Sequence, residues 1–205
     1  MMKTDRERKQ KLNVLFVCYA NRERSILAEY LLRYLLKKEC PHVEAKMNIE
    51  SAGIMPENYL KMAEEQGKPF RLPYFGKYPG RYVTQYLSER GVDAASYRSR
   101  EMKKEMAYKA DLILAVDQVM KNEISTRWPE VSAKLFTFKE FIYGKNSASL
   151  DIGEYRQLPT TDEKTGDWFM DEDYAQRYIS DVEKCVSDSL IKFVQYIDTI
   201  TLTVR

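Results

Sequence analysis

Residues 12–40 read LNVLFVCYANRERSILAEYLLRYLLKKEC, and this stretch decides the fold. The run Leu12–Cys18 is continuously apolar and rich in β-forming residues, which is typical of a strand buried on both faces. A short polar turn follows. Residues 25–40 then carry leucines at a spacing of four, which predicts a helix that ends before Pro41. A buried strand, a tight polar turn and a helix are typical of an α/β protein.

The same alternation continues along the chain. Further strand-like segments lie at residues 48–53, 109–117 and 132–138, and helical segments lie at 80–91, at 119–128 and from about 171 to 197. Because strands separated by helices pair in parallel through right-handed crossovers, the pattern predicts a three-layer α/β fold, with a four-stranded parallel sheet flanked by helices. Ligands of such sheets bind beyond the carboxyl ends of the strands, which directs attention to the residues after Cys18.

Composition excludes several classes of protein. The 205 residues are 44% hydrophobic and 31% charged, with a net charge of +2, so we expect neither a nucleic acid nor a membrane as partner. Residues 1–11 are predicted to be a basic N-terminal arm, and 12–205 a single domain with an enlarged loop at about 54–80. The three cysteines lack metal-ligand spacing, so we expect no metal site and a reduced, cytoplasmic protein.

The turn after the first strand has the composition of an anion-binding loop. Cys18 is followed by five residues and then by Arg24 and Ser25. Backbone N–H groups that lead into a helix converge on an anion, and the same field stabilises a thiolate, the nucleophilic form of cysteine. Arg24 offers a planar fork of donors for two phosphate oxygens, and Ser25 offers a hydroxyl to the thiolate. The predicted phosphate-binding residues are Tyr19, Ala20, Asn21, Arg22, Glu23, Arg24 and Ser25.

The segment FVCYANRERSILAEYLL resembles the signature of the low-molecular-weight protein tyrosine phosphatases. Three more stretches follow in that family's order: Ser51-Ala52-Gly53, the segment from Gly91-Val92-Asp93 to Ser99-Arg100, and Asp111–Asp117. The resemblance implies that Cys18 attacks phosphorus to form a cysteinyl-phosphate while Arg24 and the loop amides hold the phosphoryl oxygens. It also implies that Asn21 and Ser51 support the loop, and that no metal or organic cofactor takes part.

The resemblance further implies an aspartate that protonates the leaving group and then activates water. The family's Asp-Pro-aromatic triplet is missing from this chain. Asp167, which precedes Trp168 and lies shortly before the last predicted helix, is the preferred candidate, and Asp162 is the alternative. Asp151 and Asp171 are further alternatives, and a protein without any general acid is another.

Three residues of the loop depart from the family's pattern, and one of them is Arg22, which stands where many members have a small, apolar or cysteine residue. Ala20 stands where glycine is common, and Glu23 stands where many members carry a second cysteine that protects the first by forming a disulfide. Because Glu23 cannot form one, we predict no redox switch within the loop. The enlarged loop also holds aromatic residues that we expect to wall a slot for a phosphorylated phenol, namely Tyr59, Phe70, Tyr74, Phe75 and Tyr78.

The leading functional prediction is a phosphatase that hydrolyses phosphotyrosine or aryl phosphate monoesters. Its substrate would be a phosphorylated protein or a small aryl phosphate, and its product inorganic phosphate. One alternative is a catalytically weak phosphate-binding or regulatory protein, suggested by Ala20 and the missing triplet. A second is a protein-arginine phosphatase, disfavoured because Arg22 would repel a guanidinium product. A third is an arsenate reductase, disfavoured because no cysteine lies at residues 80–95.

Overall fold

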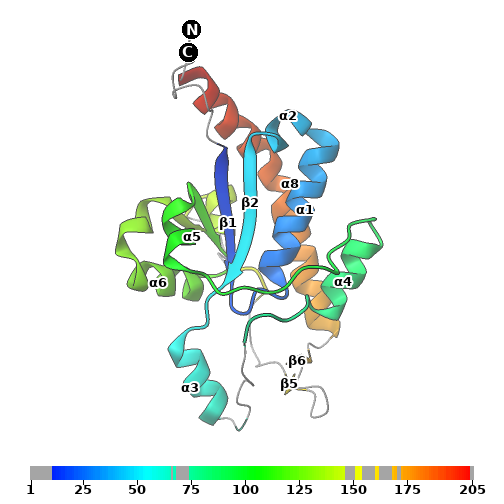
Figure 1. Ribbon diagram of the computed structural model, residues 1–205, viewed down its shortest axis with the longest axis vertical. Helices are drawn as coiled ribbons and strands as arrows, with labels where there is room; N and C mark the ends of the chain where they lie inside the picture. Colours follow the sequence, from blue (N-terminus) through cyan, green and yellow to red (C-terminus); the bar gives the residue numbers. More distant parts are fainter. Residues whose placement is uncertain are drawn as a thin grey trace.

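Four parallel strands form the central sheet of the computed structural model (Figure 1). The structure describes residues 11–65, 67, 74–145, 151–153, 160–161, 168–169 and 172–203. The sheet has the order β2-β1-β3-β4, and its strands are β1 (Leu12–Cys18), β2 (Met47–Gly53), β3 (Leu112–Ala115) and β4 (Leu135–Thr137). This arrangement confirms the predicted four-stranded parallel sheet. A separate antiparallel pair joins β5 (Thr160–Thr161) to β6 (Trp168–Phe169).

Strand β1 lies at the centre of the sheet and is buried along almost its whole length. Its ladder with β2 ends where Cys18 pairs with Gly53, and its ladder with β3 ends where Val17 pairs with Ala115. Because all three strands run in the same direction, their carboxyl ends meet at one edge. The residues that follow Cys18, Gly53 and Ala115 therefore share that edge.

Helices cover both faces of the sheet (Figure 1). Helix α1 packs against β1, β2 and α8 on one face, whereas α5 packs on β1 and α6 on β3 and β4 on the other. The helices are α1 (Arg24–Glu39), α2 (Pro41–Glu44), α3 (Glu57–Glu65), α4 (Arg81–Ser88), α5 (Lys104–Lys109), α6 (Gln118–Arg127), the 3₁₀ helix η2 (Pro129–Lys134), α7 (Phe138–Tyr143) and α8 (Glu172–Thr203). Sheet and helices form the predicted three layers.

Some predicted boundaries differ from the structure. The strand expected at 109–117 covers only Leu112–Ala115, because Asp117 accepts a hydrogen bond from the Met120 backbone and starts α6. The strand expected at 132–138 is limited to Leu135–Thr137, because Thr137 and Glu140 form a reciprocal capping box that begins α7. Within the predicted loop at 54–80, residues 57–65 form helix α3.

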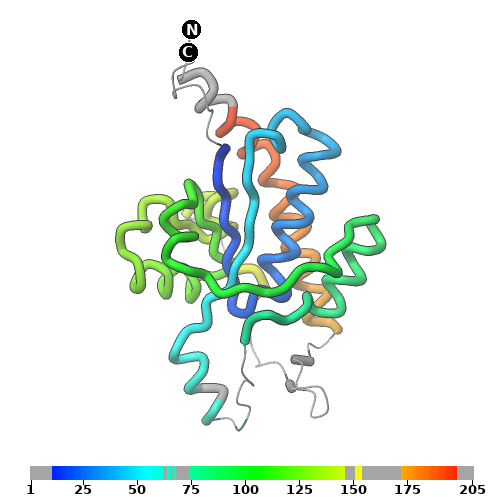
Figure 2. The backbone as a smooth tube through the Cα atoms, in the orientation of Figure 1, coloured from blue at the N-terminus to red at the C-terminus, as the bar shows by residue number. Residues whose placement is uncertain are grey.

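The first strand and the last helix orient the molecule (Figure 2). Strand β1 begins at the end of the molecule toward which α8 runs, while the carboxyl end of β1 points the opposite way. Almost all of the predicted N-terminal arm, residues 1–11, lies outside the described residues. Among the described helices, none is long and apolar enough to span a membrane.

Candidate active site

Residues 18–25, called here the phosphate loop, connect β1 directly to α1. Every residue of the loop is buried except Glu23, which is partly exposed. Among the described non-glycine residues only Asn21 has a positive φ, of 55°, and asparagine tolerates this left-handed conformation better than most side chains do. Ala20 therefore occupies the usual glycine position without a positive φ.

Cys18 lies at the start of the phosphate loop, and its thiol contacts a hydroxyl group. Its Sγ is 2.9 Å from Ser25 Oγ. Ser25 Oγ also accepts a hydrogen bond from Asn21 Nδ2 at 3.0 Å, and its own proton has two acceptors within reach, Cys18 Sγ and, at 3.5 Å, Ala52 O. A proton directed at Sγ stabilises a thiolate.

The side chain of Asn21 fixes the shape of the loop. Its Nδ2 donates to Ser25 Oγ and, at 2.9 Å, to Ser51 Oγ at the end of β2. Its Oδ1 accepts from the Arg100 backbone at 3.0 Å and from the Tyr97 hydroxyl. The predicted supporting residues Asn21, Ser25 and Ser51 are thus brought together.

A buried carboxylate lies beneath this network. Ser51 Oγ donates to Glu29 Oε2 at 2.7 Å, and Glu29 Oε1 forms an ion pair with Arg33 at 3.0 Å. Burial raises the pKa of Glu29, while the bond from Ser51 and the charge of Arg33 oppose that rise. Sequence reasoning missed Glu29 and Tyr97, because a glutamate in an amphipathic helix ordinarily faces water, and a tyrosine in an irregular segment carries no distinctive spacing.

Arg24 is almost fully buried, and its guanidinium is oriented by two contacts. Nη1 donates to Ile152 O at 2.9 Å and to Asp117 Oδ2 at 3.3 Å. Asp117 follows β3 at the sheet edge where the phosphate loop begins. Sequence reasoning noted Asp117 only as part of a family-like strand, although a carboxylate just after a parallel strand is a signal for this edge.

Aromatic side chains surround the first half of the phosphate loop. The rings of Tyr19 and Tyr59 pack 4.8 Å apart, and burial raises the pKa of both hydroxyls. Phe75 lies so close to Gly53 that a Cβ on Gly53 would be 2.7 Å from its ring and 2.5 Å from Tyr19 O. Tyr59 and Phe75 therefore lie where an aromatic wall was expected.

The other three residues expected in the aromatic wall have different surroundings. Tyr74 is partly buried against the core, and Tyr78 is 59% exposed. Tyr78 still contacts the loop through its backbone, because its carbonyl accepts from Arg22 Nε at 2.9 Å. Phe70 lies outside the described residues.

The second half of the loop contacts α4 and α8. The Gly80 backbone donates to Arg22 O at 2.9 Å, and Gly80 also packs against the carboxyl group of Glu23. From α8, the Tyr178 hydroxyl donates to Glu23 Oε2. Burial of the carboxyl group raises the pKa of Glu23 to about 7, and Tyr178, Arg22 and Arg24 oppose that rise.

Of the four aspartates considered as the general acid, only Asp151 lies among the residues that the structure describes. Asp162, Asp167 and Asp171 lie outside the described residues. Asp151 is described, and its Oδ1 accepts from the Gln118 backbone at 2.9 Å, next to Ile152, which binds Arg24.

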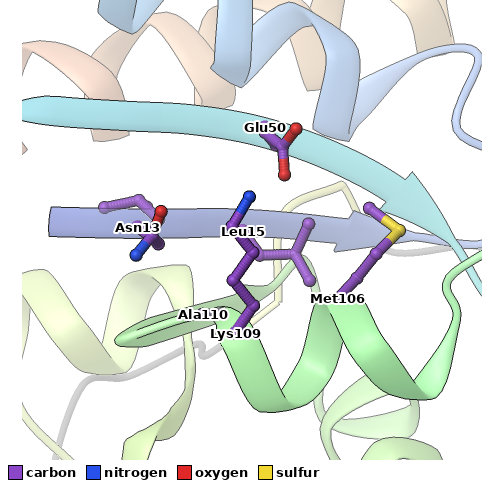
Figure 3. A pocket seen from close by; sticks show the side chains of 7 residues that line it. Asn13, Leu15, Glu50, Met106, Lys109 and Ala110 are labelled. Carbon is purple, nitrogen blue, oxygen red and sulfur yellow. The ribbon is translucent and has the colours of Figure 1, made fainter. Parts of the chain in front are cut away.

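Sites for other kinds of chemistry are not apparent in the described part of the chain. It holds no group of three or more His, Cys, Asp or Glu side chains suited to a metal ion. A recess beside β1 and α5 (Figure 3) has a volume of about 10 Å³, enough for one water molecule. Its lining residues are Asn13, Val14, Leu15, Glu50, Met106, Lys109 and Ala110, none of which belongs to the phosphate loop.

Comparison with known proteins agrees with this geometry. Residues 13–68 and 74–164 match the family model of the low molecular weight phosphotyrosine protein phosphatases. A protein-arginine-phosphatase of Geobacillus stearothermophilus is 32% identical over 138 residues, which cover 67% of this chain and 76% of the relative. A low molecular weight protein-tyrosine-phosphatase, Ptp, of Acinetobacter johnsonii is 30% identical over 135 residues, which cover 65% of this chain and 76% of the relative.

Solved structures share the fold. The crystal structure of YfkJ from Bacillus subtilis superposes with a TM-score of 0.66 at 18% identity, covering 92% of this chain and 98% of that one. The YwlE arginine phosphatase from Geobacillus stearothermophilus superposes with a TM-score of 0.63 at 23% identity, covering 94% of this chain and 96% of that one. Since the family model spans well over half of the chain and the cysteine loop lies at the expected strand end, this chain belongs to the low molecular weight phosphotyrosine protein phosphatase family.

Proposed function

We propose that this protein hydrolyses phosphate monoesters of phenols, phosphotyrosine in proteins foremost, through a phosphorylated Cys18. The observation that carries the proposal is the contact of 2.9 Å between Cys18 Sγ and Ser25 Oγ at the start of a loop that leads into α1. Such a loop directs backbone N–H groups and positive helix dipole toward a phosphoryl group.

In the first step, the Cys18 thiolate attacks phosphorus while the bond from phosphorus to the phenol oxygen breaks. The N–H groups of the loop and the Arg24 guanidinium stabilise the charge on the phosphoryl oxygens. Asp117 and Ile152 support this role of Arg24, because they hold its Nη1. An aspartic acid donates a proton to the departing phenolate.

In the second step, water attacks phosphorus and the phosphorus–sulfur bond breaks, which releases inorganic phosphate. The same carboxylate, now ionised, takes a proton from that water. The Ser25 hydroxyl stabilises the departing thiolate. We assign the acid to Asp167, with Asp162 and Asp151 as the carboxylates against which the assignment must be tested.

The phenol preference rests on the residues around the loop. Tyr19, Tyr59 and Phe75 offer aromatic surface beside Cys18, and aromatic surface favours an aryl leaving group. Because the mechanism needs a reduced thiol, we also propose that the protein works in the cytoplasm.

A second candidate substrate is phosphoarginine, favoured by the name of the 32%-identical relative. Against it stands Arg22, whose side chain lies in the phosphate loop and binds Tyr78 O. A guanidinium product would meet a like charge there.

The test is steady-state hydrolysis of p-nitrophenyl phosphate, a phosphotyrosine peptide and a phosphoarginine peptide by the native protein, Cys18→Ser and Cys185→Ser. Cys185 is a matched control, because it lies buried in α8 and burial raises its pKa to about 12. We expect aryl substrates to be preferred, Cys18→Ser to be inactive and Cys185→Ser to be unaffected. Activity that survives in Cys18→Ser would refute the proposal, and higher kcat/KM on phosphoarginine would favour the second candidate.

The acid is identified by Asp167→Asn, Asp162→Asn and Asp151→Asn. Loss of the acid must slow substrates with poor leaving groups more than those with good ones, because only a poor leaving group needs the proton. We therefore expect Asp167→Asn to lower kcat/KM, which reports the first step, about 10²–10⁴-fold on phenyl phosphate, and much less on p-nitrophenyl phosphate. The same leaving-group pattern in one of the other two variants would move the assignment to that residue.

A further inference from the structure

The phosphate loop contains a second ionisable group, Glu23, which the proposed mechanism does not use. It directly precedes Arg24 and is the N-cap residue of α1, yet its side chain does not cap the helix. Its carboxyl group instead lies between two other elements. The Tyr178 hydroxyl of α8 donates to Oε2, and Gly80 packs so closely that a Cβ there would collide with Oε1 and would displace the carboxyl group.

The charges around Glu23 come mainly from its own loop. Arg22 and Arg24 flank it in sequence and lower its pKa, as does the hydrogen bond from Tyr178. Gly80 brings no side chain, and Arg81, which follows it, is exposed and stacks on Tyr82. Despite the two arginines, burial dominates and favours the neutral carboxyl group.

A bound phosphoryl group adds negative charge to the same short loop. That charge favours a proton on Glu23, and by thermodynamic reciprocity a proton on Glu23 favours the bound anion. Arg22 and Arg24 do not titrate in the neutral range, so they cannot supply this coupling. The chain's one histidine, His42, lies in α2, which follows the far end of α1.

We propose that Glu23 is a positioning residue that couples proton uptake to oxyanion binding, so that the phosphate loop binds its substrate best when the Glu23 carboxyl group is protonated. This proposal rests on the proposed function only in requiring that an oxyanion binds the loop. It adds a pH-dependent control of affinity at neutral pH that is separate from the roles of Cys18 and of the general acid.

The experiment measures sulfate binding by isothermal titration calorimetry from pH 5.5 to 8.5. Sulfate serves as the probe because it remains a dianion throughout this range, and Cys18→Ser serves as the background because it removes the thiol. We expect sulfate affinity to fall on the order of tenfold between pH 6 and pH 8, within the usual size of such couplings. Titrations near pH 7 in buffers of different ionisation enthalpy should show net proton uptake.

Three variants in that background test the assignment. Glu23→Gln should bind sulfate with little pH dependence and no proton uptake. Tyr178→Phe should keep the pH dependence but move its midpoint to higher pH. The hydrogen bond from Tyr178 lowers the pKa of Glu23, so removing that bond raises the pKa. Glu39→Gln is the matched control. It is an exposed glutamate at the other end of α1, about 24 Å away at 1.5 Å per residue, and should behave as the parent does.

The outcomes separate this proposal from the proposed function. Sulfate binding with no pH dependence, or the full dependence retained in Glu23→Gln, would overturn the role of Glu23 and leave the phosphatase proposal intact. Absence of sulfate binding by folded protein at every pH would count against both. If Glu23→Gln does not fold, two measurements still test the role of Glu23. They are the number of protons that the Cys18→Ser parent takes up on binding sulfate, and the midpoint of the pH dependence in Tyr178→Phe.

Discussion

Asn21 shows how one side chain can organise a catalytic loop. Its amide donates to Ser25 and Ser51 and accepts from Arg100 and Tyr97, which satisfies both ends of the group. A left-handed non-glycine residue is costly, and these bonds hold it in place. The shape of the phosphate loop therefore depends on residues that come from β2 and from the segment after α4.

Tyr97 provides a test of that dependence at the scale of one hydroxyl group. Tyr97→Phe removes the donor to Asn21 Oδ1 and keeps the ring, which packs 5.9 Å from Tyr30. We expect the free energy of unfolding to fall by about 1 kcal/mol. A displaced loop should also lower kcat by roughly tenfold, with a smaller change in KM.

The control for this change is Tyr108→Phe, since Tyr108 is an exposed tyrosine of α5. Urea denaturation and steady-state kinetics measure both variants. If Tyr97→Phe matches Tyr108→Phe in kcat, the hydroxyl of Tyr97 has no part in positioning the loop.

At this scale the sequence predicts some of the site and not the rest. Cys18, Arg24 and Ser25 could be found because they follow a buried strand at a fixed spacing. Glu29 and Tyr97 could not, because their importance arises only when the fold brings α1 and the segment after α4 beneath the loop.

Two glycines, Gly53 at the end of β2 and Gly80 before α4, lie directly against the phosphate loop. Gly53 ends β2 against the backbone of Tyr19 and Ala20. Gly80 precedes α4, and the atoms nearest to a Cβ placed on it belong to the side chain of Glu23. Backbone cannot move aside as readily as the end of a side chain. The two glycines should therefore tolerate a methyl group very differently.

We predict that Gly53→Ala is more damaging than Gly80→Ala. A Cβ at Gly53 would lie 2.5 Å from Tyr19 O and 2.9 Å from Ala20 C, so the loop must shift, and we expect a loss of about 3 kcal/mol of stability together with most activity. Gly80→Ala should cost about 1 kcal/mol, because the Glu23 carboxyl group can swing away from Tyr178. Thermal unfolding and kcat/KM rank the variants, and an equal effect of both would contradict this view of the two contacts.

Glu23 links α1 to α8, and its protonation makes that link sensitive to pH. Its pKa is about 7 in the folded protein, against a reference value of 4.5. Between these values the folded state binds more protons than the unfolded state, so the stability from this group is fully present below about pH 4.5 and is lost as the pH rises through 7.

The expected loss is up to about 3 kcal/mol. Urea denaturation at pH 5.5 and pH 8 should show Glu23→Gln gaining stability relative to the native protein as the pH rises. Glu39→Gln should show no such gain. A constant difference between Glu23→Gln and the native protein at the two pH values would mean that Glu23 titrates alike in the folded and unfolded states.

The element order could be predicted well, because buried β-strands and amphipathic helices have clear periods. Short elements could not. Helix α5 has only six residues, and α7 begins inside an apolar stretch that also fits a strand, so only the capping box of Thr137 and Glu140 distinguishes them. Helix α6 begins at Gln118, one residue before the predicted start, because Asp117 caps it.

At the scale of the whole molecule, the three cysteines are distributed so that the nucleophile has no thiol partner. Cys40 ends α1 at the end away from the phosphate loop, about 24 Å along a helix of 16 residues. A disulfide requires Cα atoms within about 7 Å. Cys185 is buried in α8, where its raised pKa keeps it protonated.

Peroxide should therefore convert Cys18 to sulfenic acid and then to higher oxides, without an intramolecular disulfide. Mass spectrometry of peptides from peroxide-treated protein, digested without reductant, measures this. Added thiol should restore activity after brief exposure only, because the higher oxides are irreversible. A bridge from Cys18 to Cys40 or Cys185 would contradict the prediction.

The orientation of β1 and α8 has a practical consequence. The strand starts, and the helix ends, at the end of the molecule that faces away from the phosphate loop (Figure 1). A biotin or a surface anchor attached near either of these element ends would leave the end of the molecule that holds the phosphate loop directed toward the solution. Immobilised in this way, the protein should keep its access to bulky phosphorylated partners, and sensor-chip measurements should agree with those made free in solution.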